Sequence, residues 1–358
     1  MVTLHDVARK SGVTAATVSN VIRSKGAVGE ATRQRVLKAI EELGYRPNLM
    51  ARGLVEGKSF TLALIVENIA NSFYGEVALE IERNAREKGY HLLLYNAHEG
   101  PDVQKSPFER IPGGWVDGVI AIAGMSATEA LDLYQQGRAI VLGNWQDFGV
   151  LPEMPTVDID FEQAGYLAGQ HLIELGHQRI AVIVSGNAET RKPAHARRFQ
   201  GFCQALLKAS IALSDSHLEF ADGTTETGYS AAKKLLALEE PPTAIFASND
   251  MMAIGALSAA SDMGLQVPEE LSILGIDDIA LDAYVRPSLT TVALARKSFT
   301  EAIITSLMNQ LEKKALPELH ISIEPELIER QSTARPKSFM SSTPALHRSL
   351  QPVVVDEA

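Results

Sequence analysis

The sequence predicts an all-α helix-turn-helix head followed by a larger α/β core of two doubly wound lobes. In the first 46 residues, apolar side chains recur at helical spacing, and a glycine stands where the first two helices would turn. From Phe60 onward, apolar strand runs alternate with helical stretches, which is typical of parallel sheets with right-handed crossovers. About ten such units exceed the usual size of one sheet, so we expect two lobes.

The head, residues 1–46, is expected to contain three short helices. Gly12 supplies the positive φ that a tight turn needs, and Thr14 can cap the second helix through its hydroxyl. A third helix is expected over 31–43, with Gly44 at its end. The inward-facing residues of the three helices are Leu4, Val7, Ala8, Val18, Val21, Ile22, Val36, Leu37, Ile40 and Leu43. An ordinary helical hairpin would give a similar pattern.

Charge is divided unevenly along the 358 residues. Residues 1–58 hold ten Lys/Arg and five Asp/Glu, a net charge of +5, whereas the other 300 residues carry −16 of the total −11. A basic head on an acidic body favours binding of a polyanion by the head alone. The single cysteine, Cys203, excludes an internal disulfide. Because the sequence also lacks an 18-residue apolar run and a secretory signal, we expect a cytoplasmic location.

A short connector, residues 47–59, follows the head. Pro47 disfavours helix at the residue before it, and Asn48 is a good N-cap for a helix of under two turns. Such a helix is marginal in water by itself. We therefore expect a hinge that orders only when something stabilises it.

The core, residues 60–334, is expected to divide into one lobe of about 60–160 plus 291–320 and another of 161–290 plus 321–334. Ligands of doubly wound sheets bind at the carboxyl ends of strands, and here those ends are rich in polar and aromatic residues. The tail, residues 335–358, reads as poorly ordered because of its proline and serine content.

Several stretches resemble the lactose/galactose repressor (LacI/GalR) family. "TLHDVARKSGVTAATVSNVI" and "TRQRVLKAIEELGYRPNLMARGL" match the family's head and hinge, and "RRFQGF", "TAIFASNDMMAIGAL" and "VPEELSILGIDDIAL" match its core. The resemblance covers about residues 2–334 and implies a periplasmic-binding-protein-like core. It also implies a homodimer that represses transcription at a near-palindromic double-stranded DNA operator, under the control of a small molecule, a sugar or related metabolite, bound between the lobes.

The resemblance carries the family's DNA contacts onto named positions. Alanines here can pack on thymine methyls, and Asn20 suits adenine in place of the arginine that is common there. Leu54 would wedge between base steps in the minor groove, its alternative being a buried hinge residue. The positions carried over for base contact are Thr14, Ala15, Ala16, Thr17, Ser19 and Asn20, and those for phosphate or backbone positioning are Thr3, Thr17, Ser19, Asn48 and Arg52.

The implied effector site takes residues from the strand ends. Arg198 matches the family's effector-binding arginine, with an interlobe salt bridge as its alternative role. Asp277 and Asn249 match polar effector contacts, and Phe73 and Tyr74 are expected to line the cleft. Asn144 and Trp145 replace a more usual charged pair, which departs from a standard sugar site, and Trp145 fits a surface or interface position equally well.

Other classes of function are less consistent with the sequence. The chain shows no phosphate-binding glycine motif, no nucleophile elbow and no metal-ligand spacing, so we expect no enzyme activity, cofactor or metal. A solute-binding protein would carry an export signal and no basic head. Control by a protein corepressor in place of a small molecule remains an alternative. Segment 100–115 stands where the family has a helix that contributes to the dimer surface or to corepressor contacts, and its prolines and glycines would break such a helix. Leu346 and Leu350 are too few for a tetramerising coiled coil, so a dimer is expected.

Overall fold

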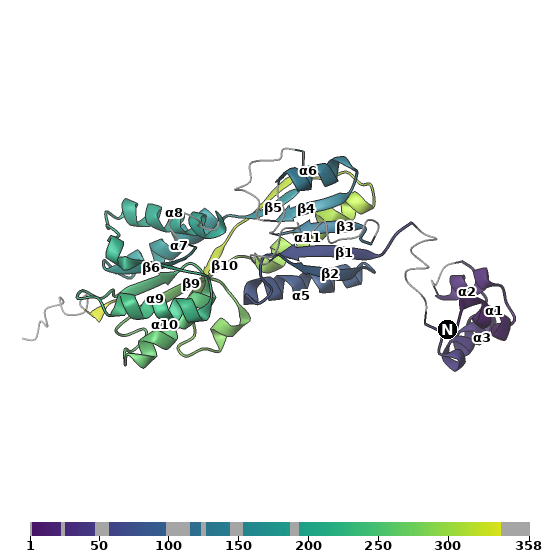
Figure 1. The fold of residues 1–358 in the computed structure, drawn as a ribbon, viewed down its shortest axis with the longest axis horizontal. Coiled ribbons are helices and arrows are strands. Elements are labelled where there is room, and N and C mark those ends of the chain that lie inside the picture. Colours follow the sequence, from purple (N-terminus) through teal and green to yellow (C-terminus); the bar gives the residue numbers. More distant parts are fainter. Residues whose placement is uncertain are drawn as a thin grey trace, which may run out of the picture. The chain divides into compact units, whose positions relative to one another are not determined.

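The structure is a computed structural model that describes residues 2–22, 26–46, 57–97, 115–122, 127–143, 153–186 and 193–337 (Figure 1). The chain divides into two compact units. The first comprises Met1–Phe60 with Gly113–Asp117, and the second comprises Thr61–Pro112 with Gly118–Ala358.

The head forms the three predicted helices, α1 (Leu4–Ser11), α2 (Ala15–Ile22) and α3 (Glu30–Leu43). Gly12 ends α1 with a φ of 67°, as the predicted tight turn requires. Four valines and two alanines, Val7, Ala8, Val18, Val21, Val36 and Ala39, form its small buried core. Leu37 was expected to face inward and does not, because 44% of its surface is exposed. Ala39 is buried in its place, whereas Val36, Ile40 and Leu43 pack inward as expected.

The first core sheet is entirely parallel and defines lobe 1. Its strand order is β11-β5-β4-β3-β1-β2. The strands are β1 (Thr61–Val66), β2 (His91–Asn96), β3 (Gly118–Ala121), β4 (Ala139–Gly143), β5 (Thr156–Ile159) and β11 (His320–Ile323). The helices of this lobe are α5 (Ser72–Glu87), α6 (Ala127–Gln135) and α11 (Arg296–Leu311), of which α11 packs on β3, β4 and β5.

The second core sheet defines lobe 2 and has the order β12-β10-β9-β8-β6-β7. Its pairs are parallel except for the edge strand β12, which runs antiparallel to β10. The strands are β6 (Ile180–Ser185), β7 (Leu218–Ala221), β8 (Ala244–Ala247), β9 (Ser272–Asp277), β10 (Thr290–Ala293) and β12 (Glu326–Ile328). The helices are α7 (Phe161–Glu174), α8 (Pro193–Lys208), α9 (Thr225–Leu236) and α10 (Asp250–Asp262), with the short 3-10 turns η2 (Asp215–His217) and η3 (Ala280–Ala283).

The predicted fold class, a helical head with a two-lobed α/β core, is confirmed, whereas the positions of two lobe boundaries differ from those expected. Strand β10 pairs wholly within lobe 2, and β11 pairs wholly within lobe 1. The expected divisions at 290/291 and 320/321 would cut through both strands. The apolar pattern of a strand does not reveal which sheet the strand joins, because that depends on the strands it pairs with in space.

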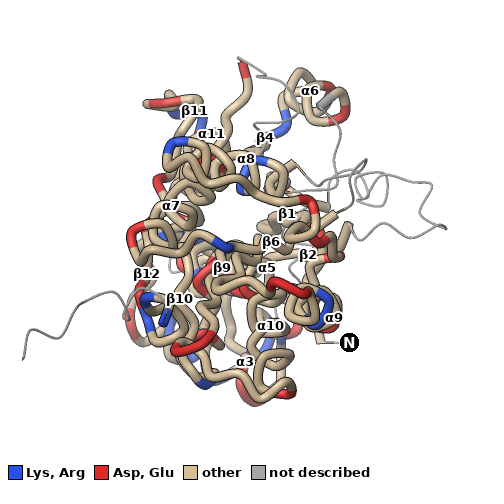
Figure 2. Tube along the Cα trace, turned by 90° about the vertical axis from the view of Figure 1, so that its left-hand side faces the viewer, with Lys and Arg blue, Asp and Glu red and all other residues tan. Residues whose placement is uncertain are grey.

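Acidic and basic positions are interspersed along the core (Figure 2).

Two glycines let α7 and α8 approach closely. A Cβ built on Gly165 would lie 1.8 Å from the carbonyl oxygen of Arg198, and one on Gly201 would lie 1.8 Å from that of Glu162. No larger residue fits at either position without moving a helix backbone. This contact sets the place of α8, and therefore of the Arg198 side chain.

Candidate functional sites

The exposed side of α2 carries the short polar and methyl side chains predicted to contact DNA. Thr14 caps the helix as expected, because its Oγ1 accepts a hydrogen bond of 3.2 Å from the Thr17 amide. Ala16 and Asn20 are both exposed and lie four residues apart, so they share one face of the helix. Ala15 instead packs partly against the head core. Ala16 and Asn20 are thus the α2 residues best placed to meet a partner.

Thr3 has a structural part that the sequence reading did not assign to it. It is the N-cap of α1 in a capping box with Asp6, where its hydroxyl donates to Asp6 Oδ2 at 2.7 Å. These hydrogen bonds from Thr3 lower the pKa of Asp6, as does the nearby Arg9. Of the other predicted DNA contacts, Thr17 and Ser19 are partly exposed on α2. Asn48, Arg52 and Leu54 lie outside the described residues.

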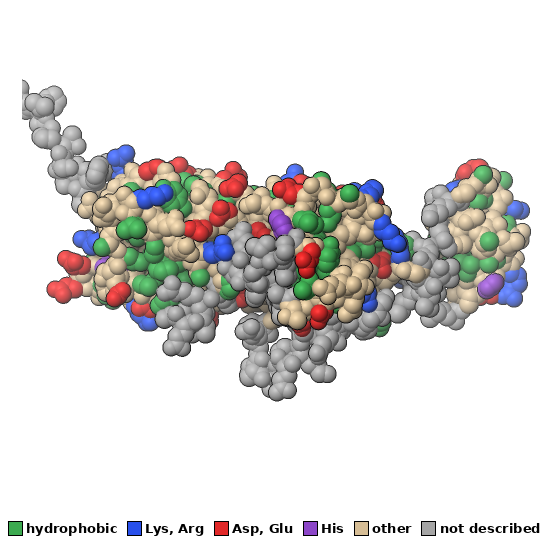
Figure 3. All heavy atoms as spheres, turned by 90° about the horizontal axis from the view of Figure 1, so that it is seen from above, with side chains coloured by type: hydrophobic (Ala, Val, Ile, Leu, Met, Phe, Trp, Pro, Cys, Tyr) green, Lys and Arg blue, Asp and Glu red, His purple; other side chains and the backbone are tan. Residues whose placement is uncertain are grey.

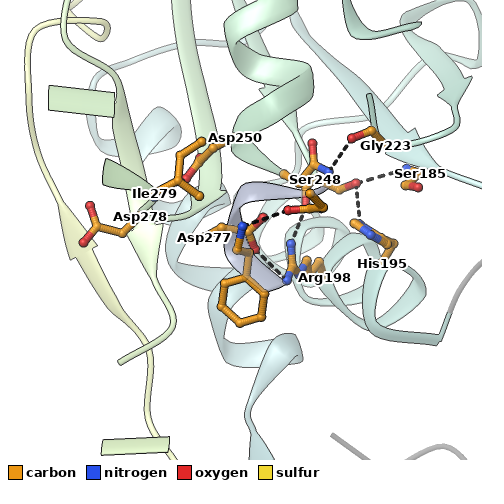
Figure 4. Close-up of polar contacts among 12 residues, drawn as sticks. Ser185, His195, Arg198, Gly223, Ser248, Asp250, Asp277, Asp278 and Ile279 are labelled. Carbon is orange, nitrogen blue, oxygen red and sulfur yellow. Dashed lines mark hydrogen bonds and ion pairs between the residues drawn. The ribbon is translucent and has the colours of Figure 1, made fainter. Parts of the chain in front are cut away.

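Arg198 is the centre of a buried polar cluster in lobe 2 (Figure 4). Its Nη2 lies 2.9 Å from Asp277 Oδ1, and its Nη1 donates to the Ser248 carbonyl oxygen at 2.6 Å. The guanidinium also stacks 4.9 Å above the Phe161 ring. Arg198 therefore forms a salt bridge, but within lobe 2 and not across the lobes. Its Nε has no hydrogen-bond partner among the described residues.

Asp277 ends β9 with a backbone φ of 137°, an uncommon conformation for a residue other than glycine. Its side chain is 3% exposed, and burial raises its pKa to about 7, although Arg198 acts to lower it. Asp277 Oδ1 forms the ion pair with Arg198 Nη2, but it accepts no hydrogen bond of good geometry from the described residues. The cluster thus holds a cation, an anion and two polar atoms that are still able to bond.

Asn249 has a stronger structural role than the predicted one. Its Oδ1 accepts from the Met252 amide at 2.9 Å as the N-cap of α10, and its Nδ2 donates to the Gly223 carbonyl oxygen at 2.9 Å. Both ends of the amide are therefore used within lobe 2. These contacts also tie the loop at Gly223 to the strand ends.

Three residues of this cluster were missed from the sequence. Ser248 Oγ accepts from the Ser185 amide and pairs with His195 Nδ1, both at 3.0 Å. Ser185 is fully buried, and its own Oγ has no hydrogen-bond partner among the described residues. Ser185 ends β6 and Ser248 follows β8. These two strands flank the point where the strand order reverses, which is where doubly wound folds bind ligands, and that position was the signal that could have identified them.

Lobe 1 contributes two aromatic residues from the first turn of α5. Phe73 and Tyr74 contact each other edge to face at 5.5 Å, and Asn71 caps the helix below them. Tyr74 donates to Glu67 Oε2 at 3.2 Å, and its pKa is raised by burial and by Glu67. The charges of Arg198 and Asp277 also act on this pKa, in opposite directions.

A direct contact also joins the lobes here, since Ser72 Oγ lies 3.6 Å from Met251 Sδ. Asn144 and Trp145, which were predicted to line the same place, lie outside the described residues. Within the described ranges, no group of three or more His, Cys, Asp or Glu side chains could hold a metal ion. No helix in that part of the chain is both long and apolar enough to cross a membrane.

Comparison with known proteins agrees with this architecture. Residues 3–48 match the family model described as bacterial regulatory proteins, lacI family, and residues 169–333 match that of a periplasmic binding protein-like domain. Catabolite control protein A of Priestia megaterium is 36% identical over 334 residues, which cover 93% of this chain and 99% of that protein. The transcriptional repressor PurR of Klebsiella pneumoniae is 33% identical over 336 residues, 93% of this chain and 97% of that one. A solved complex of the regulator CelR with cellobiose is 29% identical, with a TM-score of 0.67 over 93% of this chain and all of that one.

Proposed function

The chain belongs to the lacI family of bacterial regulatory proteins, and from this premise we propose how it represses transcription. A homodimer places two heads on a near-palindromic operator, and a small uncharged molecule held between the lobes controls that binding. Its curated relatives are transcriptional regulators, and such a protein acts in the cytoplasm, where the bacterial chromosome lies. The proposal depends most on the buried Arg198 cluster. There Arg198 is ion-paired with Asp277, but Arg198 Nε and Ser185 Oγ have no hydrogen-bond partner among the described residues and can bind a ligand.

Base reading by the head would depend on few side chains. Ala16 can pack on a thymine methyl, and Asn20 can bond the N6 and N7 of adenine. Because neither residue is charged, much of the affinity must come from phosphate contacts, which are sensitive to salt. The net charge of +5 over residues 1–58 supports that division of labour.

Selection from random double-stranded DNA with the full-length protein tests this reading. The recovered sites should be near-palindromic, and Asn20→Ala should weaken binding to them by about 1–3 kcal/mol, with relaxed preference at one base pair per half-site. Gln34→Ala is a matched control, since Gln34 is exposed on α3 and bonds Glu30 of the same helix. Leu54→Ala should weaken operator binding while the core stays folded. If no DNA is preferred over random sequence at any salt concentration, the proposal is wrong.

The effector we propose is an uncharged polyhydroxylated molecule of the sugar class. The carboxyl group of Asp277 already lies 2.9 Å from the Arg198 guanidinium, so an anionic ligand would have to compete with this buried partner. Hydroxyl groups can both donate and accept. They suit Ser185 Oγ and Arg198 Nε, which have no hydrogen-bond partner in the described part of the chain, and Asp277 Oδ1, which has only the ion pair to Arg198. The similarity to a cellobiose-bound regulator favours the same class.

A thermal-shift screen of the full-length protein tests the effector class. Cellobiose, ribose, other neutral sugars, sugar acids, nucleosides and purines are compared, because a ligand that binds only the folded state raises its unfolding temperature. A neutral sugar should produce the largest shift, and Asp277→Asn should abolish it. Glu82→Gln on α5, where the partly exposed Glu82 pairs with Arg86, should leave the shift unchanged. A shift given only by acids or purines would contradict the class. No shift at all, with a protein partner captured instead, would favour the corepressor alternative.

We place the dimer contact on the α5 and η3 side of the core. Leu79, Leu281 and Tyr284 are 68%, 47% and 75% exposed, and α5 meets η3 where the Ala280 amide donates to Glu76. The face of the core on the α6 and α8 side, opposite α5 in Figure 1, mixes apolar side chains with acidic and basic ones (Figure 3). In sedimentation velocity, Leu79→Asp should shift the protein toward monomer. Leu207→Asp on α8, where the leucine is 79% exposed, should leave the dimer unchanged, and equal behaviour of the two variants would refute the placement.

A further inference from the structure

An ion triad in lobe 1 lies beside the candidate effector site. Arg296, the first residue of α11, places its Nη2 2.8 Å from Glu76 Oε2 and its Nε 3.1 Å from Glu80 Oε1. Glu76 and Glu80 lie one turn apart on α5, and Thr300 donates to the free oxygen of Glu80 at 3.1 Å. Each of the three charged side chains is 20–24% exposed, so solvent screens them only in part. The triad is complete within lobe 1.

Lobe 2 meets the triad through two backbone groups. The Ala280 amide donates to Glu76 Oε1 at 2.9 Å, and Arg296 Nη1 donates to the Asp278 carbonyl oxygen at 3.2 Å. Lobe 1 therefore presents a charged acceptor, Glu76, to the Ala280 amide, and a charged donor, Arg296, to the Asp278 carbonyl oxygen. Hydrogen bonds in which one partner is ionised are stronger than neutral ones.

The two backbone groups follow directly after Asp277, which pairs with Arg198. On the other side, α5 carries Phe73 and Tyr74 in its first turn and Glu76 in its next. Arg296 follows Ala295, whose φ of 42° is left-handed. Ala295 lies where the chain crosses from β10 of lobe 2 to α11 of lobe 1. Along the chain, the contact therefore lies next to candidate site residues of both lobes.

We propose that Glu76, Glu80 and Arg296, with the Asp278 carbonyl and the Ala280 amide, form an interlobe latch that holds the lobes in the arrangement seen here. Arg296 is a positioning residue, because its contacts are with Glu76, Glu80 and the 278–280 backbone. Opening of the lobes breaks two charge-assisted hydrogen bonds but leaves the triad intact in lobe 1. The latch therefore sets how readily the lobes separate before any ligand binds.

The consequence for regulation rests on the proposed function, whereas the latch itself does not. A ligand that requires joined lobes binds a latched protein more tightly, since less of its binding free energy is used to bring the lobes together. The test is therefore made without ligand and without DNA. Its failure would leave the operator and effector experiments above unaffected.

Hydrogen–deuterium exchange of the full-length protein reports on the latch directly, because the Ala280 amide donates one of the two hydrogen bonds of the latch. Peptides that cover residues 278–284 are compared in wild type, Glu76→Gln and Arg296→Met, with Glu82→Gln as the matched control on α5. Exchange in this segment should become faster by on the order of tenfold in the two latch variants, the effect of losing a charge-assisted hydrogen bond. The control and the β8 peptides should match wild type.

Two further readouts separate a latch from simple packing. Added salt should speed exchange of the 278–284 segment in wild type and have little effect in Glu76→Gln, and Arg296→Lys should restore part of the protection. In the double variant, exchange of the segment should equal that of a single variant, because the loss of either hydrogen bond is enough to open the latch. If Arg296→Met fails to fold, the near-isosteric Glu76→Gln decides the question. Unchanged exchange in Glu76→Gln, or faster exchange spread evenly over lobe 2, would overturn the proposal.

Discussion

Replacing Arg198 with methionine should make the stability of the core depend on pH in a range where the wild type does not. The change removes the ion pair to Asp277, the hydrogen bond to the Ser248 carbonyl and the stacking on Phe161. The lost hydrogen bond and stacking should cost about 2–4 kcal/mol at any pH. The lost ion pair adds a second effect, because Asp277 must then be buried without a cation.

The sign of that second effect follows from the pKa of Asp277. In the wild type the folded pKa is about 7, above the ordinary value, so its stabilising contribution is lost as pH rises toward 7 and changes little beyond that. Without Arg198 the folded pKa rises further, and stability continues to fall above pH 7. The difference in unfolding free energy between variant and wild type should therefore be flat below pH 7. Above pH 7 it should grow by about 1.4 kcal/mol per pH unit, the slope for one proton.

Urea unfolding followed by circular dichroism, from pH 5.5 to 9 at one protein concentration, measures this difference. Other titrating groups are shared by both proteins and cancel. Adding Asp277→Asn to the Arg198→Met background should remove the slope, and Arg179→Met, at an exposed arginine that bonds the Pro241 carbonyl, should show none. A difference that stays flat up to pH 9, or that grows below pH 7, would refute this account of the pair.

Three further predictions concern packing, a buried acid and the head. Gly201→Ala should destabilise lobe 2 by about 1–3 kcal/mol or more in thermal unfolding, because its Cβ would lie 1.8 Å from the Glu162 carbonyl oxygen; an unchanged melting temperature would contradict this. Burial raises the pKa of the fully buried Asp282 to about 7, so the wild type should lose stability as pH rises from about 4 to 7. Asp282→Asn should abolish this loss, which is at most about 4 kcal/mol in the free energy of urea unfolding. An identical pH profile in the two proteins argues against this role. Thr14→Val should destabilise the head by about 1 kcal/mol in its thermal transition, because the Thr17 amide loses its cap, whereas Thr14→Ser should keep it.

The pattern of apolar residues was enough to predict the order of elements. The helical spacing around Gly12 and the cap at Thr14 are local features, set by backbone sterics and by hydrogen bonds between near neighbours, and both are confirmed. The alternation of strands and helices after Phe60 likewise follows from short-range periodicity, and it led to the correct fold class. The same periodicity failed at Leu37, where the packing of three helices decides which side of α3 faces inward.

The candidate site shows the limit of reasoning from strand ends. Asp277 and Arg198 could be selected from motifs, but their pairing within one lobe could not, because 79 positions separate them along the chain. Ser185 carries no motif and enters the cluster only because β6 and β8 are neighbours.

The sequence by itself therefore determined the elements, the head and the family, since these depend on local periodicity and on motifs that survive in linear order. Tertiary structure alone decided which polar atoms meet. It assigned β10 and β11 to their sheets and buried Asp282. It also joined Arg296 of α11 to the backbone beside Asp277. The physical reason is that hydrogen bonds and ion pairs act over a few ångströms in space, whereas the sequence records only distance along the chain.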